Sequence, residues 1–153
     1  MLKKSAQQAA NQIRLLAKAM ECMKPALEKT TELPADTPET IIQQNLISWF
    51  KVKYKDIYDS GALFAVPNEG KRSRANASRM KAEGLLSSVS DLILLVPRGQ
   101  YHGFCMEMKK KGQAPSKGQA EWLSHRRLSG YYAEYYDTLE SAQAAFDGYL
   151  NLK

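Results

Sequence analysis

Apolar residues recur every three to four positions at the start of the chain, and again after a polar stretch that contains prolines. The first pattern predicts a helix over residues 4–23, which Pro25 ends or kinks. A second helix is expected to begin near Thr37, a favourable N-cap, with Pro38 in the first helical position, and to run to about Tyr54. The first helix therefore has the character of an arm, which could cover the following domain, join a dimer or contact nucleic acid.

Short apolar or aromatic runs predict four strands. Residues 62–66, ALFAV, form a run that Pro67 stops. Residues 92–96, LILLV, are continuously apolar, which is typical of a strand buried on both faces. The segment VPRGQY supplies a turn, and residues 102–109, HGFCMEMK, form the returning strand. A fourth, aromatic strand is expected over residues 131–136.

Two further helices are expected in the second half of the chain. Ser116 and Gln119 have the spacing of a capping box, and Gly130 ends that helix at the preferred C-terminal position. The last helix follows Thr138 and has one apolar face. Residues 68–84 are polar and basic, and are expected to form a loop with a helical turn near its end.

This order of elements predicts an α/β fold in which a mixed central β-sheet is flanked by helices. Residues 1–36 are expected to form the N-terminal helical arm and its linker. Residues 37–153 are then expected to form a single compact domain, a usual size for one hydrophobic core.

The composition agrees with a folded domain, because 44% of the 153 residues are hydrophobic and 25% are charged. A net charge of +6 fits a partner that carries phosphates, but it is weak evidence alone. No apolar run has the length of a membrane span or the character of a secretory signal. Cys22 and Cys105 are far apart and the histidines are isolated, so we expect no zinc site, and a reduced, cytoplasmic protein.

Charged residues border the second and third expected strands. Asp91 precedes the first of them, and Glu107 and Lys109 end the second. If the turn is centred on Gly99, Asp91 and Glu107 lie equally far from it and are directly opposite one another in an antiparallel pair. Side chains alternate along a strand, so Glu107 and Lys109 share one face. The other face then carries Phe104, Met106 and Met108. A shift by one residue would abolish this arrangement.

Two neighbouring carboxylates repel one another unless a positive charge lies between them. Magnesium suits such a site, since it takes oxygen ligands and is usually held by one or two carboxylates together with water and substrate phosphate. A bound cation polarises a phosphoryl oxygen and lowers the pKa of water, while a nearby lysine orients that water or offsets developing charge. The pattern therefore points to phosphodiester hydrolysis.

Each of these residues also has a structural interpretation. Asp91 alone could cap a turn, and Glu107 with Lys109 could form an exposed ion pair of little energetic value. Glu39 lies where the helix dipole favours any acid, and Gln119 is fully explained by the capping box. The pairing of Asp91 with Glu107 across one hairpin favours the catalytic interpretation.

The spacing of Asp91, Glu107, Lys109 and Gln119 resembles that of the PD-(D/E)xK nuclease superfamily, and most closely its virus-type replication-repair nuclease domain, VRR-NUC. The resemblance covers about residues 37–150. PETIIQQNLISWFK is similar to the first helix of the family, and FAVPNEGKRS to its strand and Asn-Gly-Arg loop. KAEGLLSSVSDLILL is similar to the approach to its metal-binding aspartate, and GFCMEMKKKGQAPSKGQAEWLSHRRLSGYYAEYYDTLESA resembles the remainder of the domain. The chain departs from the family in one place, where SVS at 88–90 replaces Gly-x-Pro before the aspartate.

The resemblance implies a restriction-endonuclease-like core and a Mg²⁺-dependent deoxyribonuclease for which Mn²⁺ substitutes. Asp91 and Glu107 would ligate the metal, helped by the backbone carbonyl of Met108, and Lys109 would act on the water or the phosphate. Glu39 would support the metal site from the first helix. Gln119 would be the signature glutamine of the family beside that site.

The resemblance also implies partners. Stand-alone phage-type members are expected to be homodimers that act on four-way junctions or other branched DNA, in the cytoplasm of a bacterial host. Basic and amide residues that flank the acidic site are expected to contact DNA, although they could be simply solvated surface: Asn68, Lys71, Arg72, Arg74, Lys110, Lys111 and Lys117. The alternatives are a non-catalytic nucleic-acid-binding module with the same fold, and a nuclease directed at RNA.

Overall fold

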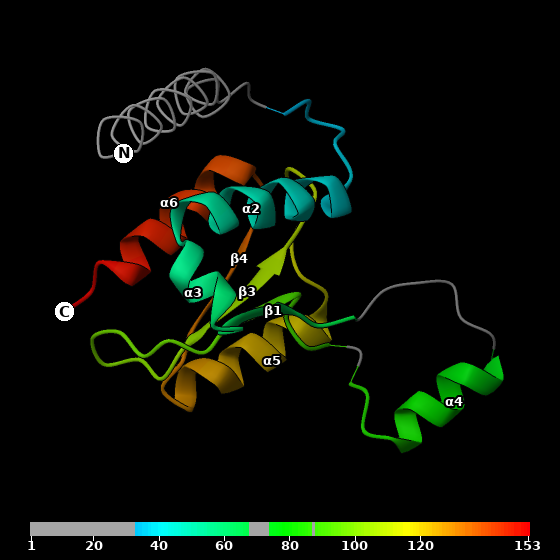
Figure 1. The fold of residues 1–153 in the computed structure, drawn as a ribbon. Helices are drawn as coiled ribbons and strands as arrows, with labels where there is room; N and C mark the ends of the chain where they lie inside the picture. The colour runs from blue at the N-terminus through cyan, green and yellow to red at the C-terminus, as the bar shows by residue number, and fades with distance from the viewer. Residues whose placement is uncertain (1–32, 68–73, 87) are drawn as a thin grey trace, which may run out of the picture. The chain divides into compact units, whose positions relative to one another are not determined.

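A computed structural model of the chain describes residues 33–67, 74–86 and 88–153, and Figure 1 shows its fold. The chain divides into two units between residues 32 and 33, and the described residues belong to the second, Leu33–Lys153. The helix expected over 4–23 and the arm that contains it lie outside the described residues. Within the described residues, no helix combines the length and the apolar character needed to cross a bilayer.

Helices and strands follow one another along the second unit much as expected. In chain order the described elements are α2 (Glu39–Lys53), α3 (Lys55–Asp59), β1 (Leu63–Ala65), α4 (Arg74–Ala82), β2 (Leu92–Leu94), β3 (Phe104–Met108), α5 (Lys117–Leu128), β4 (Tyr132–Tyr136) and α6 (Leu139–Leu150).

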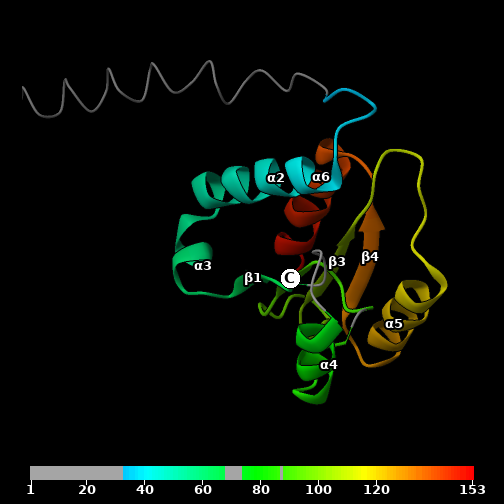
Figure 2. The same ribbon diagram turned by 90° about the vertical axis from the view of Figure 1, so that its right-hand side faces the viewer.

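The four strands form one sheet in the order β1-β2-β3-β4. Strands β1, β2 and β3 pair antiparallel, whereas β3 and β4 are parallel and are connected through α5. Figure 2 shows α2 and α6 on one side of the sheet and α5 on the other. The expected mixed sheet flanked by helices is therefore confirmed.

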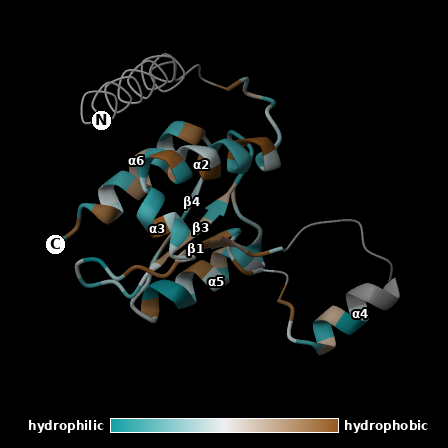
Figure 3. Ribbon diagram, in the orientation of Figure 1, coloured by the Kyte–Doolittle hydropathy of each residue, from teal (hydrophilic) through white to brown (hydrophobic). Residues whose placement is uncertain are grey.

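Successive side chains of a strand point to opposite faces of the sheet, so the hydrophobic residues form two cores, one on each face. Leu92, Leu94, Phe104, Met106 and Met108 pack with buried residues of α2 and α6 in the larger core. A smaller core on the opposite face joins Cys105 of β3 and Ala133 of β4 to Leu123 of α5. Hydrophobic residues alternate with hydrophilic ones along the helices that cover the sheet, as amphipathic helices require (Figure 3).

The register of the β2–β3 hairpin agrees with the prediction. Leu92 pairs with Met106 and Leu94 with Phe104. Continued by one residue, this register places Asp91, which directly precedes β2, opposite Glu107. Both carboxylates therefore lie at the same end of the hairpin.

The turn itself differs from the one expected, because it is not centred on Gly99. Arg98 and Tyr101 pair through two backbone hydrogen bonds, so Gly99 shares the turn with the next residue. Residues 95–97 on one side then face only residues 102–103 on the other. This one extra residue offsets the shift of the turn and restores the predicted register, in the manner of a bulge.

One helix boundary and one element were predicted wrongly. Helix α2 begins at Glu39, and its N-cap is Pro38, whose ψ of 143° is extended; Thr37 is buried and does not cap the helix. The segment expected to be a loop with a helical turn contains the nine-residue helix α4. Its alanines are good helix formers, but its basic residues hide any apolar stripe in the sequence.

Candidate active site

The centre of the candidate site is a buried ion pair at the end of β3. Glu107 is only 1% exposed and Lys109 only 7%. The Lys109 Nζ atom lies 2.9 Å from Glu107 Oε1. An exposed pair on an edge strand is therefore excluded, and both charges have been removed from water at a cost of several kcal/mol per ion before pairing. Such a cost requires compensating contacts from other elements.

Helix α5 supplies one of these contacts through Gln119. Ser116 caps the helix as predicted: its hydroxyl accepts from the Gln119 backbone N–H, and Gln119 Oε1 accepts from the Ser116 N–H at 2.9 Å. The other end of the same amide, Nε2, donates to Glu107 Oε1. The capping box thus holds Gln119 in the orientation that fixes the buried carboxylate, so the structural and the functional interpretations of this glutamine describe one arrangement.

Asp91 joins the site from the start of β2. Its Oδ2 atom accepts a hydrogen bond of 2.9 Å from the backbone N–H of Met108. The N–H of Lys109, the next residue, bonds instead to Tyr136 on the opposite side of β3. Because the N–H and C=O of one strand residue point to the same side, the Met108 carbonyl faces the side of β3 on which Asp91 lies.

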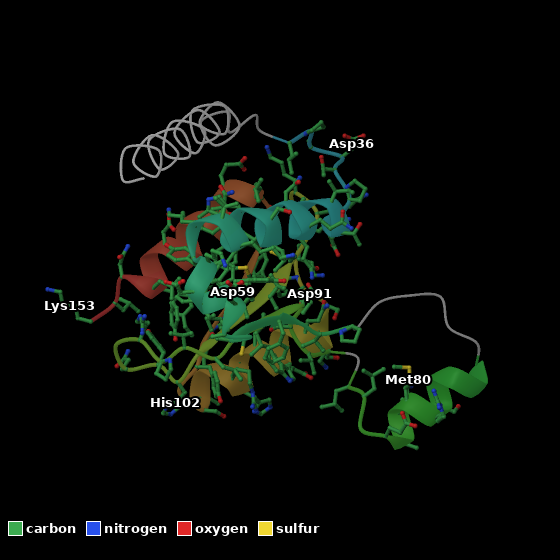
Figure 4. All side chains as sticks on the ribbon, in the orientation of Figure 1. Asp36, Asp59, Met80, Asp91, His102 and Lys153 are labelled. Atoms are coloured by element: carbon green, nitrogen blue, oxygen red, sulfur yellow. The ribbon has the colours of Figure 1, made fainter. Side chains whose placement is uncertain are left out.

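Helix α2 contributes Glu39 from its first turn. Glu39 Oε1 accepts a hydrogen bond of 3.0 Å from the backbone N–H of Lys110, and Oε2 lies 3.7 Å from Lys109 Nζ. Figure 1 shows that the beginnings of α2 and α5 lie at the same end of the sheet, and Figure 4 shows Asp91 there. The structure therefore brings together the five residues predicted for catalysis: Glu39, Asp91, Glu107, Lys109 and Gln119.

Burial and neighbouring charges perturb the titration of the central pair. Burial, and then the charge of Asp91, raise the pKa of Glu107 from 4.5 to about 7, although Lys109 opposes the rise. Burial alone would lower the pKa of Lys109, but the hydrogen bond and charge of Glu107, with Glu39 and Asp91, outweigh it and raise that pKa. Lys109 is therefore a cation at neutral pH, and it does not fully neutralise the surrounding carboxylates.

One oxygen atom of the Glu107 carboxylate is available to bind a cation. Glu107 Oε2 is buried and makes no hydrogen bond within the part of the chain that the structure describes. In the same part of the chain, no three His, Cys, Asp or Glu side chains are arranged as a complete metal-binding group. Two carboxylates and a backbone carbonyl lack the nitrogen and sulfur donors that zinc prefers, and they are few ligands for calcium. They suit Mg²⁺, which keeps waters and binds substrate phosphate.

The residues predicted to contact DNA are only partly described. Exposed side chains beside the site are those of Lys110, Lys111 and Lys117. The Lys117 Nζ atom lies 3.9 Å from Glu121 Oε1. Arg74 begins α4, and its side chain is outside the described part. The others, Asn68, Lys71 and Arg72, lie outside the described residues.

Sequence reasoning missed several residues around the carboxylates. Gln43 and Thr40, on α2, line a recess beside Glu39 and Asp91. Gln43 follows Glu39 by four residues, a spacing that places both on one face of a helix and could have drawn attention to it. Ser90, in the segment that departs from the VRR-NUC pattern, is fully buried directly before Asp91.

No family model matches the chain, and no curated protein matches it. A solved structure described as "VRR_NUC domain protein" is similar to it, with a TM-score of 0.66 and 23% sequence identity over 76% of this chain and 90% of that chain. At this identity the similarity establishes the fold. The resemblance to VRR-NUC is thus confirmed as a resemblance of fold, and the chain has the restriction-endonuclease-like α/β core of that domain.

Proposed function

We propose that the chain is a metal-dependent endonuclease that hydrolyses phosphodiester bonds in DNA. The observation that carries this proposal is the buried Glu107–Lys109 pair, which Gln119 holds beside Asp91. Among the described residues, one oxygen of the Glu107 carboxylate has no hydrogen-bond partner. A structural ion pair would have its oxygens satisfied, because an unpaired buried acceptor costs about 1–3 kcal/mol. An incomplete set of oxygen ligands next to a lysine is what a metal-assisted phosphoryl site requires.

Each residue of the site has its own role in this proposal. Asp91 and Glu107 would hold Mg²⁺ or Mn²⁺ with the Met108 carbonyl, and a bound cation supplies charge that polarises the phosphate and lowers the pKa of water. Lys109 is protonated and therefore donates hydrogen bonds, rather than acting as a base. Its ammonium group would stabilise negative charge on the phosphate in the transition state.

Glu39 and Gln119 position this pair. Gln119 prevents the Glu107 carboxylate from turning away, and Glu39 holds the start of the segment after β3 through the Lys110 N–H. The reaction consumes one water: its oxygen bonds to phosphorus as one phosphorus–oxygen bond to a deoxyribose breaks. The departing sugar oxygen takes up a proton, and the nucleophilic water loses one.

The preferred substrate in this proposal is branched DNA, such as a four-way junction, in phage-type replication, recombination or repair. A homodimer would place two sites on one junction and cut two strands. Support for this finer claim comes from the sequence resemblance, and from the exposed Lys110, Lys111 and Lys117 beside the site, which suit phosphate contacts.

The test is incubation of the purified chain with labelled duplex, flap and four-way-junction DNA and with matching RNA, in Mg²⁺, in Mn²⁺ and in chelator. Metal-dependent cuts that are fastest on branched DNA are expected. Preferential cutting of RNA would show that the substrate is RNA and not DNA. Binding without any cutting would instead favour the non-catalytic module. A monomeric mass in solution under DNA-binding conditions would contradict the homodimer.

A further inference from the structure

A recess opens beside the carboxylates and is not used by the proposed hydrolysis. Its volume is about 180 Å³. It lies between the first turns of α2 and the C-terminal end of β1, which occupy the same end of the sheet in Figure 1. The residues that line it are Glu39, Thr40, Gln43, Ala65, Val66, Pro67 and Asp91.

The chemistry of the lining changes across the recess. Glu39 and Asp91 bring two acids of the candidate active site to its wall, whereas the β1 end contributes the apolar side chains of Ala65, Val66 and Pro67. The α2 wall adds neutral polar groups. A nucleotide would match this lining. Its charged phosphate would lie at the metal held by the acids, and its neutral base would place its apolar faces and polar edges against the rest of the recess.

Gln43 is the group suited to read such an edge. Its amide carries two donors and one acceptor oxygen, which is the set that pairs with the edge of a base. It is half-buried, and within the described residues nothing bonds to its side chain. Its position four residues after Glu39 fixes it on the face of α2 that already contributes to the candidate site.

We propose that this recess receives the base of one nucleotide next to the scissile phosphate, and that Gln43 is a specificity-determining residue that contacts the base edge. The inference rests on the proposed nuclease function and adds a substrate requirement to it. The recess is smaller than the roughly 300–1,000 Å³ of sites for drug-sized ligands, so it suits a single base.

A base enters such a recess only if it leaves the helical stack. Removing a base from a paired duplex costs a few kcal/mol, and the cost is least for one that is already unpaired. The recess thus selects DNA with an unpaired nucleotide beside the cleavage position, as flaps and imperfect junctions provide. A fully paired linear duplex would be cut more slowly for this reason alone.

The experiment compares Gln43→Ala with Gln44→Ala, a control of the same residue type on the same helix that does not line the recess. Substrates carry a single abasic position, moved stepwise through the nucleotides around the cut. At one position, loss of the base is expected to slow the wild type and the Gln44→Ala variant by about tenfold, the scale of one base contact. Gln43→Ala should be slow on the intact substrate, and should lose little more at that position.

A second variant, Ala65→Leu, fills the recess from β1 without altering a carboxylate, and is expected to slow cleavage of unpaired sites. The same comparisons are made on DNA affinity in Ca²⁺, so the base contact is measured even if the wild type binds without cutting. Equal abasic sensitivity of wild type and Gln43→Ala at every position overturns the inference while leaving the nuclease proposal intact. A wild type that neither binds nor cuts DNA overturns both.

Discussion

Because the pKa of Glu107 is raised, we expect that the ionised Glu107 carboxylate destabilises the folded protein when no metal is bound. Ionising this buried carboxylate in the folded state is unfavourable, since the pKa rises from 4.5 to about 7. A rise of this size corresponds to at most about 3–4 kcal/mol, and we expect about 2 kcal/mol because the structure relaxes around a buried charge. We therefore expect Glu107→Gln to stabilise the metal-free protein.

The sign of the pH dependence follows from linkage. A group whose folded pKa is raised stabilises the folded state below its unfolded pKa, and this contribution is lost as the pH rises through the folded value. For Glu107 the loss occurs between about pH 4.5 and pH 7. The advantage of Glu107→Gln should therefore be about 2 kcal/mol at pH 8.5 and less than about 1 kcal/mol at pH 5.

The assay is urea unfolding at both pH values, with chelator and then with Mn²⁺. Glu121→Gln is the control, because Glu121 is an exposed acid on α5 whose pairing with Lys117 is long. Metal at a hundred times its dissociation constant should stabilise the wild type by about 2.7 kcal/mol, and the Glu107→Gln variant far less. A variant less stable than the wild type at pH 8.5 in chelator would refute the reasoning, and would make Glu107 and Lys109 a structural ion pair.

Four further outcomes are expected. Lys109→Met should lower the single-turnover cleavage rate by about 10²–10³-fold, the scale of one lost donor to the transition state, while DNA affinity measured in Ca²⁺ changes little. Ser116→Ala should destabilise the protein by about 1 kcal/mol in urea unfolding, because it removes the cap of α5. Gly118→Ala should leave metal binding measured by calorimetry nearly unchanged, because the added Cβ would lie 2.7 Å from the Ser88 hydroxyl oxygen, which can rotate away, and 3.5 Å from Ser88 Cβ, an ordinary contact; a large loss of binding that Ser88→Ala restores would show instead that this hydroxyl is held in place. Lys111→Ala should reduce the slope of log affinity against log salt by about one for branched DNA, and an unchanged slope would show that this lysine contacts no phosphate.

The hairpin was predictable because its geometry depends on local rules. Two apolar strands, a glycine in the turn and strict alternation predict that Asp91 and Glu107 are opposed. The register is as predicted because the extra residue within 95–97 compensates for a turn that is offset by one residue, and the sequence did not predict this bulge. The capping role of Gln119 was predictable for a similar reason, since the capping box is a pattern of four consecutive residues, whereas its position beside Glu107 was expected only from the family resemblance. In both cases the sequence positions that determine the structure are close together in the chain.

Features that depend on contacts between distant segments could not be predicted in this way. The recess beside Gln43 forms only where α2 meets the end of β1, and no spacing within either element indicates it. The start of α2 was misjudged by one residue: proline is favoured at the first helical position, but the ψ of 143° at Pro38 keeps this residue outside the helix as its N-cap. Likewise, the contacts of Lys109 with β4, through its backbone N–H, and with Glu39, through its side chain, join segments that are distant in sequence.

The central claim is that Glu107, with Asp91 and Lys109, forms a metal-dependent hydrolytic site. The most direct measurement is the single-turnover cleavage rate of a labelled four-way junction in Mg²⁺ by wild type, Glu107→Gln and Glu121→Gln. We predict that the wild type and Glu121→Gln cut the junction in Mg²⁺ but not in chelator, and that Glu107→Gln binds it without detectable cutting. Cleavage by Glu107→Gln at the wild-type rate, or cleavage that persists in chelator, would contradict the claim.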